Sequence, residues 1–482
     1  MRSQRKKRLF RWLFLAALLC SLVVGLFASQ EQKELPKIPQ FSQNFASWPI
    51  NLGRRIAQIR AYIPTIDRVV IVPDQTTFFK AIADWSLAGR WPILIGDNSY
   101  TEMFLERFKP AEVIHLAPVS SNTPLQESII GAVAAAWDAE DVVSLKETWQ
   151  SLGWQPPGVV ITSQQDSALP AAVALATAYG QPLVFLEGDF GTANDTLTPQ
   201  QWKSLTTEVE NLVKLTGYPY AQLGDSIDTV TLVRQLGVKY PSPEKDDQPL
   251  AVTDGLARNQ NGSRWAVVGW IYGDTNRAVY QAMCSLFLDM NTALFYDSYQ
   301  KTPPWLNYEM NTPSRELSQV GIQTKLVQRP QAGKITWRGL TDEKWDYDWI
   351  FVNSKGTPSE FEVGDGEVDV NDIPQLKFPA AIYFIHSFSA ATPDNPATIA
   401  ARWLENGAYA YVGSVHEPFL YAFIPPKYLI RRMMVGSPFL VAARYLDSPP
   451  WKITTIGDPL MIISQPRPRI SPQSLKNNSS DR

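Results

Sequence analysis

Three adjoining stretches decide the fold class: AAIYFIHS at residues 380–387, TIAARWLENG at 398–407 and AYAYVGSVHE at 408–417. The first and last are apolar runs rich in aromatic and branched residues, which is typical of strands buried in a parallel sheet. The stretch between them predicts a helix that ends at Asn406 and Gly407. A strand, a helix and a strand in this order form a right-handed crossover, so we expect two neighbouring parallel strands.

Both apolar runs stop on a histidine, and the whole chain has only three histidines. In open α/β sheets, ligands bind just beyond the carboxyl ends of the strands. The sequence therefore predicts a site at this edge of the sheet. The polar residues expected there, including those at the end of a third strand expected at 348–354, are His386, Ser387, His416, Glu417, Asn353 and Lys355.

The composition is that of folded domains with an acidic body. Hydrophobic residues make up 45% of the 482 positions and charged residues 19%, and this length accommodates two to four domains. Six of the 44 Lys and Arg residues lie in the first eleven positions, which leaves 38 basic residues against 47 acidic ones. Nucleic-acid binding needs clustered basic residues over phosphate, so we exclude nucleic acid as a partner.

The N-terminal basic cluster is followed by LFLAALLCSLVVGLFA at residues 13–28, which carries no charge. This order predicts a secretory signal or an uncleaved signal anchor. Leu26 and Phe27 occupy positions where a cleavage site needs small residues, which favours an anchor at 1–28 with the body outside the cytoplasm, on the periplasmic or extracellular side. Cys284 is the one cysteine beyond this segment, so no disulfide forms within the body, as suits a bacterial envelope.

An internal repeat follows a polar linker at 29–62. Residues 69–97 and 159–189 match at an offset of 90, and each reads as a strand, an Ala-rich helix, a turn and a second strand. Both copies therefore predict a βαβ unit with a parallel pair of strands. Neither copy has a Gly-rich dinucleotide motif or a phosphate-binding P-loop, so we expect no nucleotide.

The final domain begins after a second, Pro-rich linker. We expect strands at 265–271, 293–299, 334–340 and 348–354, with a helix at 276–290 between the first two. The acidic segment 360–372 matches the second half of a calcium loop. However, Phe361 and Val363 stand at the first and third ligand positions, so we interpret the segment as a surface turn.

These elements define seven regions, with an α/β fold of tandem βαβ repeats followed by a domain with a mainly parallel sheet. They are an anchor at 1–28, a linker at 29–62, α/β repeats at 63–155 and 156–240, a linker at 241–262, a final domain at 263–463 and a disordered tail at 464–482.

The runs FPAAIYFIHSFSA, GAYAYVGS and IGDPLMII resemble the caspase-like fold, and within it the gingipain-like cysteine peptidases and related uncharacterised exported bacterial proteins. The βαβ repeats are similar to the tandem α/β repeats of cell-wall-binding proteins. In the peptidase family a His-Gly turn follows one strand and the nucleophilic cysteine ends the next. The corresponding positions here are Lys355 and Gly356, then His386 and Ser387. The resemblance therefore implies a caspase-like domain without its Cys/His pair, so the chain is not a cysteine peptidase.

We expect a membrane-anchored binding or scaffold protein of the cell envelope, with no cofactor. Its partners are the membrane and a polypeptide or another envelope component held at the strand ends. The alternative is a hydrolase. It would use Ser387 as nucleophile with His386 or Lys355 as base, or a divalent metal held by His386, His416 and Glu417.

Overall fold

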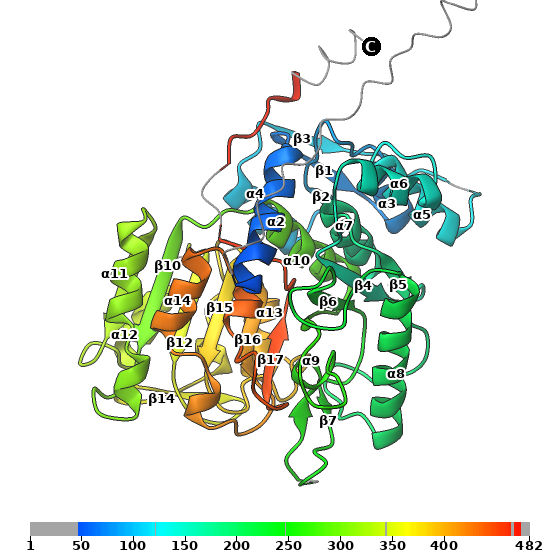
Figure 1. Ribbon diagram of the computed structural model, residues 1–482. Coiled ribbons are helices and arrows are strands. Elements are labelled where there is room, and N and C mark those ends of the chain that lie inside the picture. Colours follow the sequence, from blue (N-terminus) through cyan, green and yellow to red (C-terminus); the bar gives the residue numbers. More distant parts are fainter. Residues whose placement is uncertain (1–46, 121, 246, 343–344, 464–466, 474–482) are drawn as a thin grey trace, which may run out of the picture. The chain divides into compact units, whose positions relative to one another are not determined.

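A computed structural model describes residues 47–120, 122–245, 247–342, 345–463 and 467–473 of the chain. Within these residues the main feature is a ten-stranded sheet (Figure 1). Its strands, in spatial order, are β11 (Gln323–Gln328), β10 (Thr292–Asp297), β12 (Trp349–Asn353), β15 (Ala380–Ile385), β16 (Ala408–Ser414), β17 (Ile453–Ile456), β9 (Val267–Ile271), β6 (Thr229–Val233), β4 (Gly158–Thr162) and β5 (Leu183–Phe185).

Within this sheet only the pairing of β16 with β17 is antiparallel. The strands from β11 to β16 therefore run one way, and those from β17 to β5 run the other way. As a result, the carboxyl ends of β15 and β16 share an edge with the starts of β17 and β9. The expected neighbouring parallel strands at 380–387 and 408–417 are confirmed, because β15 and β16 pair in parallel.

The two βαβ units form as expected but join different sheets. The first unit is β1 (Arg68–Val72), α3 (Gln75–Ala83) and β2 (Ile93–Ile95), and its sheet has the order β2, β1, β3, with β3 at Glu112–His115. The second unit is β4, α7 (Leu169–Tyr179) and β5, and the order β5, β4, β6 repeats that arrangement at the end of the large sheet. Repeat 156–240 thus shares one continuous sheet with the expected final domain.

Helix α10 (Thr275–Phe287) links the two sheets. It packs against α7, β16 and the first unit's β2, and every residue from Arg277 to Phe287 is buried. The Ile93 amide of β2 contacts the Met283 sulfur at 3.4 Å. The Asp274 carboxylate accepts from the first amides of the helix, as an N-cap does. Cys284 is fully buried here and acts as a small core residue.

The remaining helices and short strands lie around the two sheets (Figure 1). The α-helices are α2 (Trp48–Tyr62), α4 (Ser99–Phe108), α5 (Leu125–Ala135), α6 (Val142–Ser151), α8 (Pro199–Leu215), α9 (Val252–Gly255), α11 (Asn311–Gln319), α12 (Lys334–Asp342), α13 (Ile399–Glu405), α14 (Pro426–Met434) and α15 (Phe439–Ala442). The short strands are β7 (Lys239–Tyr240), β8 (Leu250–Ala251), β13 (Glu360–Val363) and β14 (Gly366–Asp369), which form two antiparallel hairpins.

The structure differs from the sequence-based expectation in several segments. Residues 334–340 form helix α12, so the predicted strand there is wrong. The expected linker 29–62 contains helix α2, and the linker 241–262 contains β8 and α9. The prediction of a disordered tail is wrong for residues 467–473, because the Ile470 amide donates to the Thr65 carbonyl at 2.9 Å.

The expected anchor at 1–28 lies outside the described residues. Within the part of the chain that the structure describes, no helix combines the length and apolarity needed to cross a membrane.

Candidate functional site

The backbone at the carboxyl ends of β12, β15 and β16 is joined by direct hydrogen bonds. The Ser354 amide donates to the Ile385 carbonyl at 2.9 Å. The buried Ser414 hydroxyl lies 3.1 Å from the His386 carbonyl and 2.8 Å from the His416 carbonyl. The structure therefore brings the three predicted strand ends to one edge, in the order that the sequence indicates.

His386 is a buried, neutral core side chain. It is 1% exposed, and its Nε2 bonds the Glu360 carbonyl of strand β13 at 3.1 Å. Burial lowers its pKa to about 4, with the hydrogen bond to Glu360 opposing that shift. Its Nδ1 has no hydrogen-bond partner among the described residues. The ring therefore stays uncharged at neutral pH and is turned into the protein.

Gly356 makes room for this imidazole. Its φ is +154°, and a Cβ built there would lie 2.2 Å from the Glu360 carbonyl oxygen and 2.8 Å from His386 Nε2. Both distances are shorter than real Cβ contacts, so a larger residue would displace the histidine or the hairpin. The Lys355-Gly356 turn thus has a structural reason for its glycine that does not depend on catalysis.

Ser387 lacks a base in this arrangement. Its side chain is half-buried, and within the described residues its hydroxyl makes no hydrogen bond. Lys355 is directed elsewhere, because its Nζ pairs with Glu362 Oε2 at 3.0 Å. His386 faces the Glu360 carbonyl. The nucleophile and base of the hydrolase alternative are therefore near each other in the chain but are not assembled into a working pair.

The residue after Ser387 adopts an unusual backbone conformation. Phe388 has a φ of +62°, which is in the left-handed region, and a bulky residue there costs roughly 1–3 kcal/mol. Its amide bonds the Ser414 hydroxyl at 3.1 Å, and its ring lies 4.8 Å from that of His416. Strain of this kind often occurs at functional sites, and here it turns the chain sharply after β15.

His416 and Glu417 begin the turn after β16. Burial lowers the pKa of His416, the Lys452 ammonium adds to this effect, and Glu417 opposes it. Glu417 Oε1 accepts from the Phe419 amide at 3.0 Å, so the carboxylate stabilises its own turn. Among the described residues, no hydrogen bond or ring contact joins the two imidazoles. The ring of His386 instead lies 5.5 Å from that of Phe384.

The three-residue metal site of the hydrolase alternative is not assembled. In the described ranges, no group of three or more His, Cys, Asp or Glu side chains is placed to hold a metal ion. His386, His416 and Glu417 each face a different neighbour.

Asn353 connects two strand ends and does not line an open groove. It is fully buried, and its amide nitrogen donates to Asp297 Oδ1 at 2.7 Å and to the Tyr308 carbonyl at 3.0 Å. Burial raises the pKa of Asp297, and the hydrogen bond from Asn353 opposes that shift. Asp297 ends β10, and sequence reasoning missed it. The sequence signal that could have indicated it is that the apolar run ALFY ends on an aspartate.

Two further features were missed. The strained backbone at Phe388 has no sequence signal, because phenylalanine is an ordinary residue in an apolar run. Asp254 is a fully buried carboxylate that contacts three arginines, yet it lies in the segment 241–262 that the sequence suggested as a linker. The adjacent TDG and the following Arg258 and Arg264 were the only clues.

Comparisons with known proteins add little. No family model matches the chain, and no curated protein matches it. A solved structure described as "Structure of Protease" aligns with a TM-score of 0.41 at 10% identity, covering 65% of this chain and 80% of that chain. A likeness this weak carries no argument about activity.

Proposed function

We propose that the protein is a membrane-anchored, extracytoplasmic binding or scaffold protein whose C-terminal domain is a caspase-like domain without catalysis. The observation that carries this proposal is the state of His386. It stands at the position of the family's nucleophile, and it is buried, uncharged and bonded to the Glu360 backbone. A group in this state contributes to packing and cannot attack a substrate.

The resemblance to the caspase-like fold supports the proposal in one further respect. The two family positions must lie side by side, and the strands that carry Lys355 and His386 pair directly in parallel. The neighbouring half-buried Ser387 and His416 leave polar groups at the rim, where an extended polypeptide of the envelope would bind.

A binding experiment tests the strand-end rim around Ser387. Peptides selected on the folded protein should lose at least tenfold in affinity with Ser387→Arg, because a long cation would fill the rim. The matched control is Ser151→Arg, at the exposed end of α6, which should leave binding unchanged. If both variants bind the selected peptides as the parent does, the strand-end rim is not the binding site.

A second experiment tests catalysis directly. A fluorophosphonate probe labels activated serines. We expect Ser387 to stay unlabelled, so the folded parent and the Ser387→Ala variant should be labelled to the same extent. Labelling that depends on Ser387 would contradict the proposal and favour the hydrolase alternative.

The anchor is tested by deletion of residues 1–28. The full chain should remain in the membrane fraction after alkaline extraction, and the shortened chain should be released. If the full chain were released as well, it would not be anchored by this segment.

A further inference from the structure

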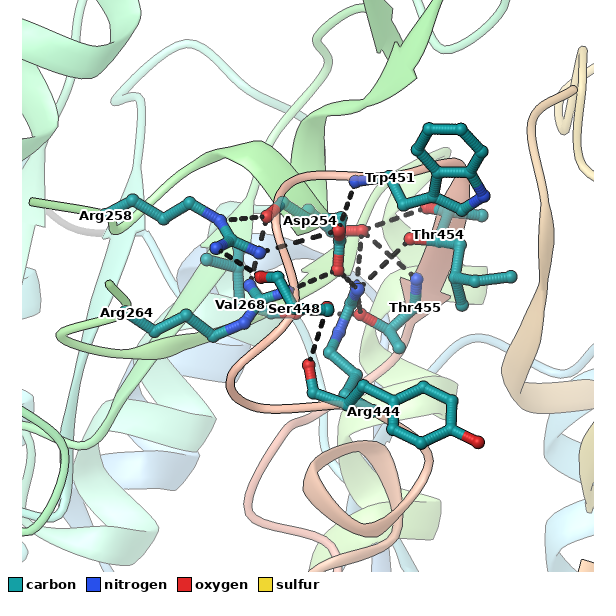
Figure 2. A network of polar contacts seen from close by, with 12 residues as sticks. Asp254, Arg258, Arg264, Val268, Arg444, Ser448, Trp451, Thr454 and Thr455 are labelled. Atoms are coloured by element: carbon teal, nitrogen blue, oxygen red, sulfur yellow. Dashed lines mark hydrogen bonds and ion pairs between the residues drawn. The ribbon is translucent and has the colours of Figure 1, made fainter. Parts of the chain in front are cut away.

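A buried charge cluster lies at the same edge of the sheet, on the other side of β16 from His386. Its centre is Asp254, which follows β8 and is 4% exposed. Arg264 Nη2 donates to Asp254 Oδ1 at 2.6 Å, and Arg444 bonds the same oxygen. Arg258 Nη2 lies 3.7 Å from Asp254 Oδ2. Figure 2 shows the three guanidinium groups arranged around this one carboxylate.

The charges of this cluster do not balance. Three arginines face one aspartate, so the four side chains carry an excess of two positive charges, and the side chains of all four are at most 5% exposed. Burial alone would raise the pKa of Asp254, but the arginines outweigh it and hold the pKa below its ordinary value. Burial lowers the pKa of Arg444 to about 10, which leaves it charged at neutral pH. Excess buried charge is unfavourable unless a counter-charge approaches it.

A cavity of about 230 Å³ lies beside the cluster. Arg444 and Asp254 line it, and the Arg444 Nε is a buried donor without a hydrogen-bond partner among the described residues. Aromatic side chains form the walls: Tyr421 is 68% exposed, Tyr445 is 39% exposed, and Trp451 is half-buried. A ligand in this cavity would meet positive charge at one end and flat apolar surfaces along its sides.

The walls are held in place by backbone contacts. The Trp451 amide donates to Asp254 Oδ2 at 2.6 Å, and its indole nitrogen donates to the Pro418 carbonyl at 2.7 Å. Phe419 has a φ of +63° and stacks on Tyr421 at 5.6 Å. Trp451 therefore contacts the charge cluster and the cavity at once, while Phe419 packs against the exposed Tyr421 wall.

We infer that this cavity binds a small organic acid with an aromatic or aliphatic body, whose carboxylate lies at the end of the cavity nearest the buried arginines and is attracted by their excess charge. The carboxylate supplies the missing negative charge, and the body packs between Tyr421, Tyr445 and Trp451. This site is separate from the His386 site, so the inference stands whether or not the proposed function holds.

The test compares an acid with its uncharged isostere on the full folded chain. Isothermal titration with 3-phenylpropanoate and with 3-phenylpropanamide should show at least tenfold tighter binding of the acid, with an affinity that falls as salt rises. Tyr421→Ala removes an exposed wall without touching the charge cluster, and it should weaken the acid several-fold. Equal affinities for acid and amide, or no binding of either at about 10 mM, would overturn the inference.

A second measurement does not depend on the choice of ligand. Ser448 lines the cavity and its carbonyl accepts from Arg258 at 2.8 Å, so Ser448→Glu would place a carboxylate near the excess positive charge, and Ser448→Gln is the matched neutral control. We expect the glutamate variant to have the larger free energy of unfolding at pH 7. A glutamate variant no more stable than the glutamine variant would also overturn the inference.

Discussion

At the scale of single residues, the state of His386 predicts a pH dependence of stability. Its pKa is lowered from 6.5 to about 4 in the folded protein, so between these values the unfolded chain binds a proton that the folded chain does not. The contribution of His386 to the free energy of unfolding is therefore fully present above pH 6.5. It falls as the pH drops toward 4, by roughly 1.4 kcal/mol per pH unit.

Replacement of His386 by glutamine isolates this contribution. Denaturant titrations at pH 7 and pH 4.5 should show a smaller loss of unfolding free energy on acidification for His386→Gln than for the parent. His115 is 59% exposed, so His115→Gln is the control for replacing a histidine at the surface. If the parent and the His386→Gln variant lost the same unfolding free energy between pH 7 and pH 4.5, His386 would not be held neutral by burial.

The contact between Gly356 and His386 makes a second prediction at this scale. Gly356→Ala places a Cβ against the Glu360 carbonyl and the imidazole of His386. We therefore expect the free energy of unfolding to fall by roughly 2–4 kcal/mol. Gly262 also has a positive φ, of +83°, but a Cβ there meets nothing within 4 Å. Gly262→Ala should therefore cost only about 1 kcal/mol, from backbone strain alone. Equal losses in thermal or denaturant unfolding would mean that Gly356 is needed only for its backbone angle.

At the scale of elements, helix α12 depends on a carboxylate from a distant turn. Asp365, in the turn between β13 and β14, accepts from the Lys334 amide at 2.6 Å and so caps the start of the helix. Asp365→Ala should cost roughly 1 kcal/mol, while Asp365→Asn keeps an acceptor and should cost less. Since the segment is a hairpin turn in our interpretation, calcium should not change the melting temperature of the parent. A calcium-dependent rise in that temperature would contradict the interpretation.

The same helix shows where sequence reasoning succeeds and fails. Strands β12, β15 and β16 were predictable because their apolar runs are continuous and buried on both faces. In α12 the spacing of Ile335 and Trp337 looks like the alternation of a strand. In the structure Ile335 is 84% exposed, while Trp337 and Leu340 are buried at helical spacing. The residue that caps this helix lies about thirty positions away in the chain, so no local pattern indicates it.

The candidate site was predictable only in its location. The strand ends meet where the order of strands requires, but the roles of individual side chains depend on contacts between segments. The Glu360 carbonyl that bonds His386 comes from a hairpin, and Glu362 in the same hairpin forms an ion pair with Lys355. The charge cluster around Asp254 joins residues about 190 positions apart. Such contacts leave no signal in the spacing of residues.

At the scale of the whole molecule, the continuous ten-stranded sheet predicts one cooperative unfolding unit. The second repeat and the C-terminal strands share this sheet, because β6 pairs with β9 and β9 with β17. Leu232 in β6 is fully buried, and Leu232→Ala should cost roughly 2–5 kcal/mol. If the sheet unfolds as one unit, this loss is shared by distant strands.

Hydrogen exchange followed by mass spectrometry measures how far that loss spreads. Under conditions where exchange occurs through global unfolding, Leu232→Ala should speed exchange in peptides from β4 and β6 and, by the same factor, in peptides from β15 and β16. Ile382→Ala, at a fully buried position of β15, is the reciprocal variant and should speed exchange in β4 and β6. Strand pairing carries the effect in both directions, since removal of either half exposes the apolar edge of the other. If each variant speeds exchange only on its own side of β17, the two halves unfold separately, as expected for the domain boundary at 241–262.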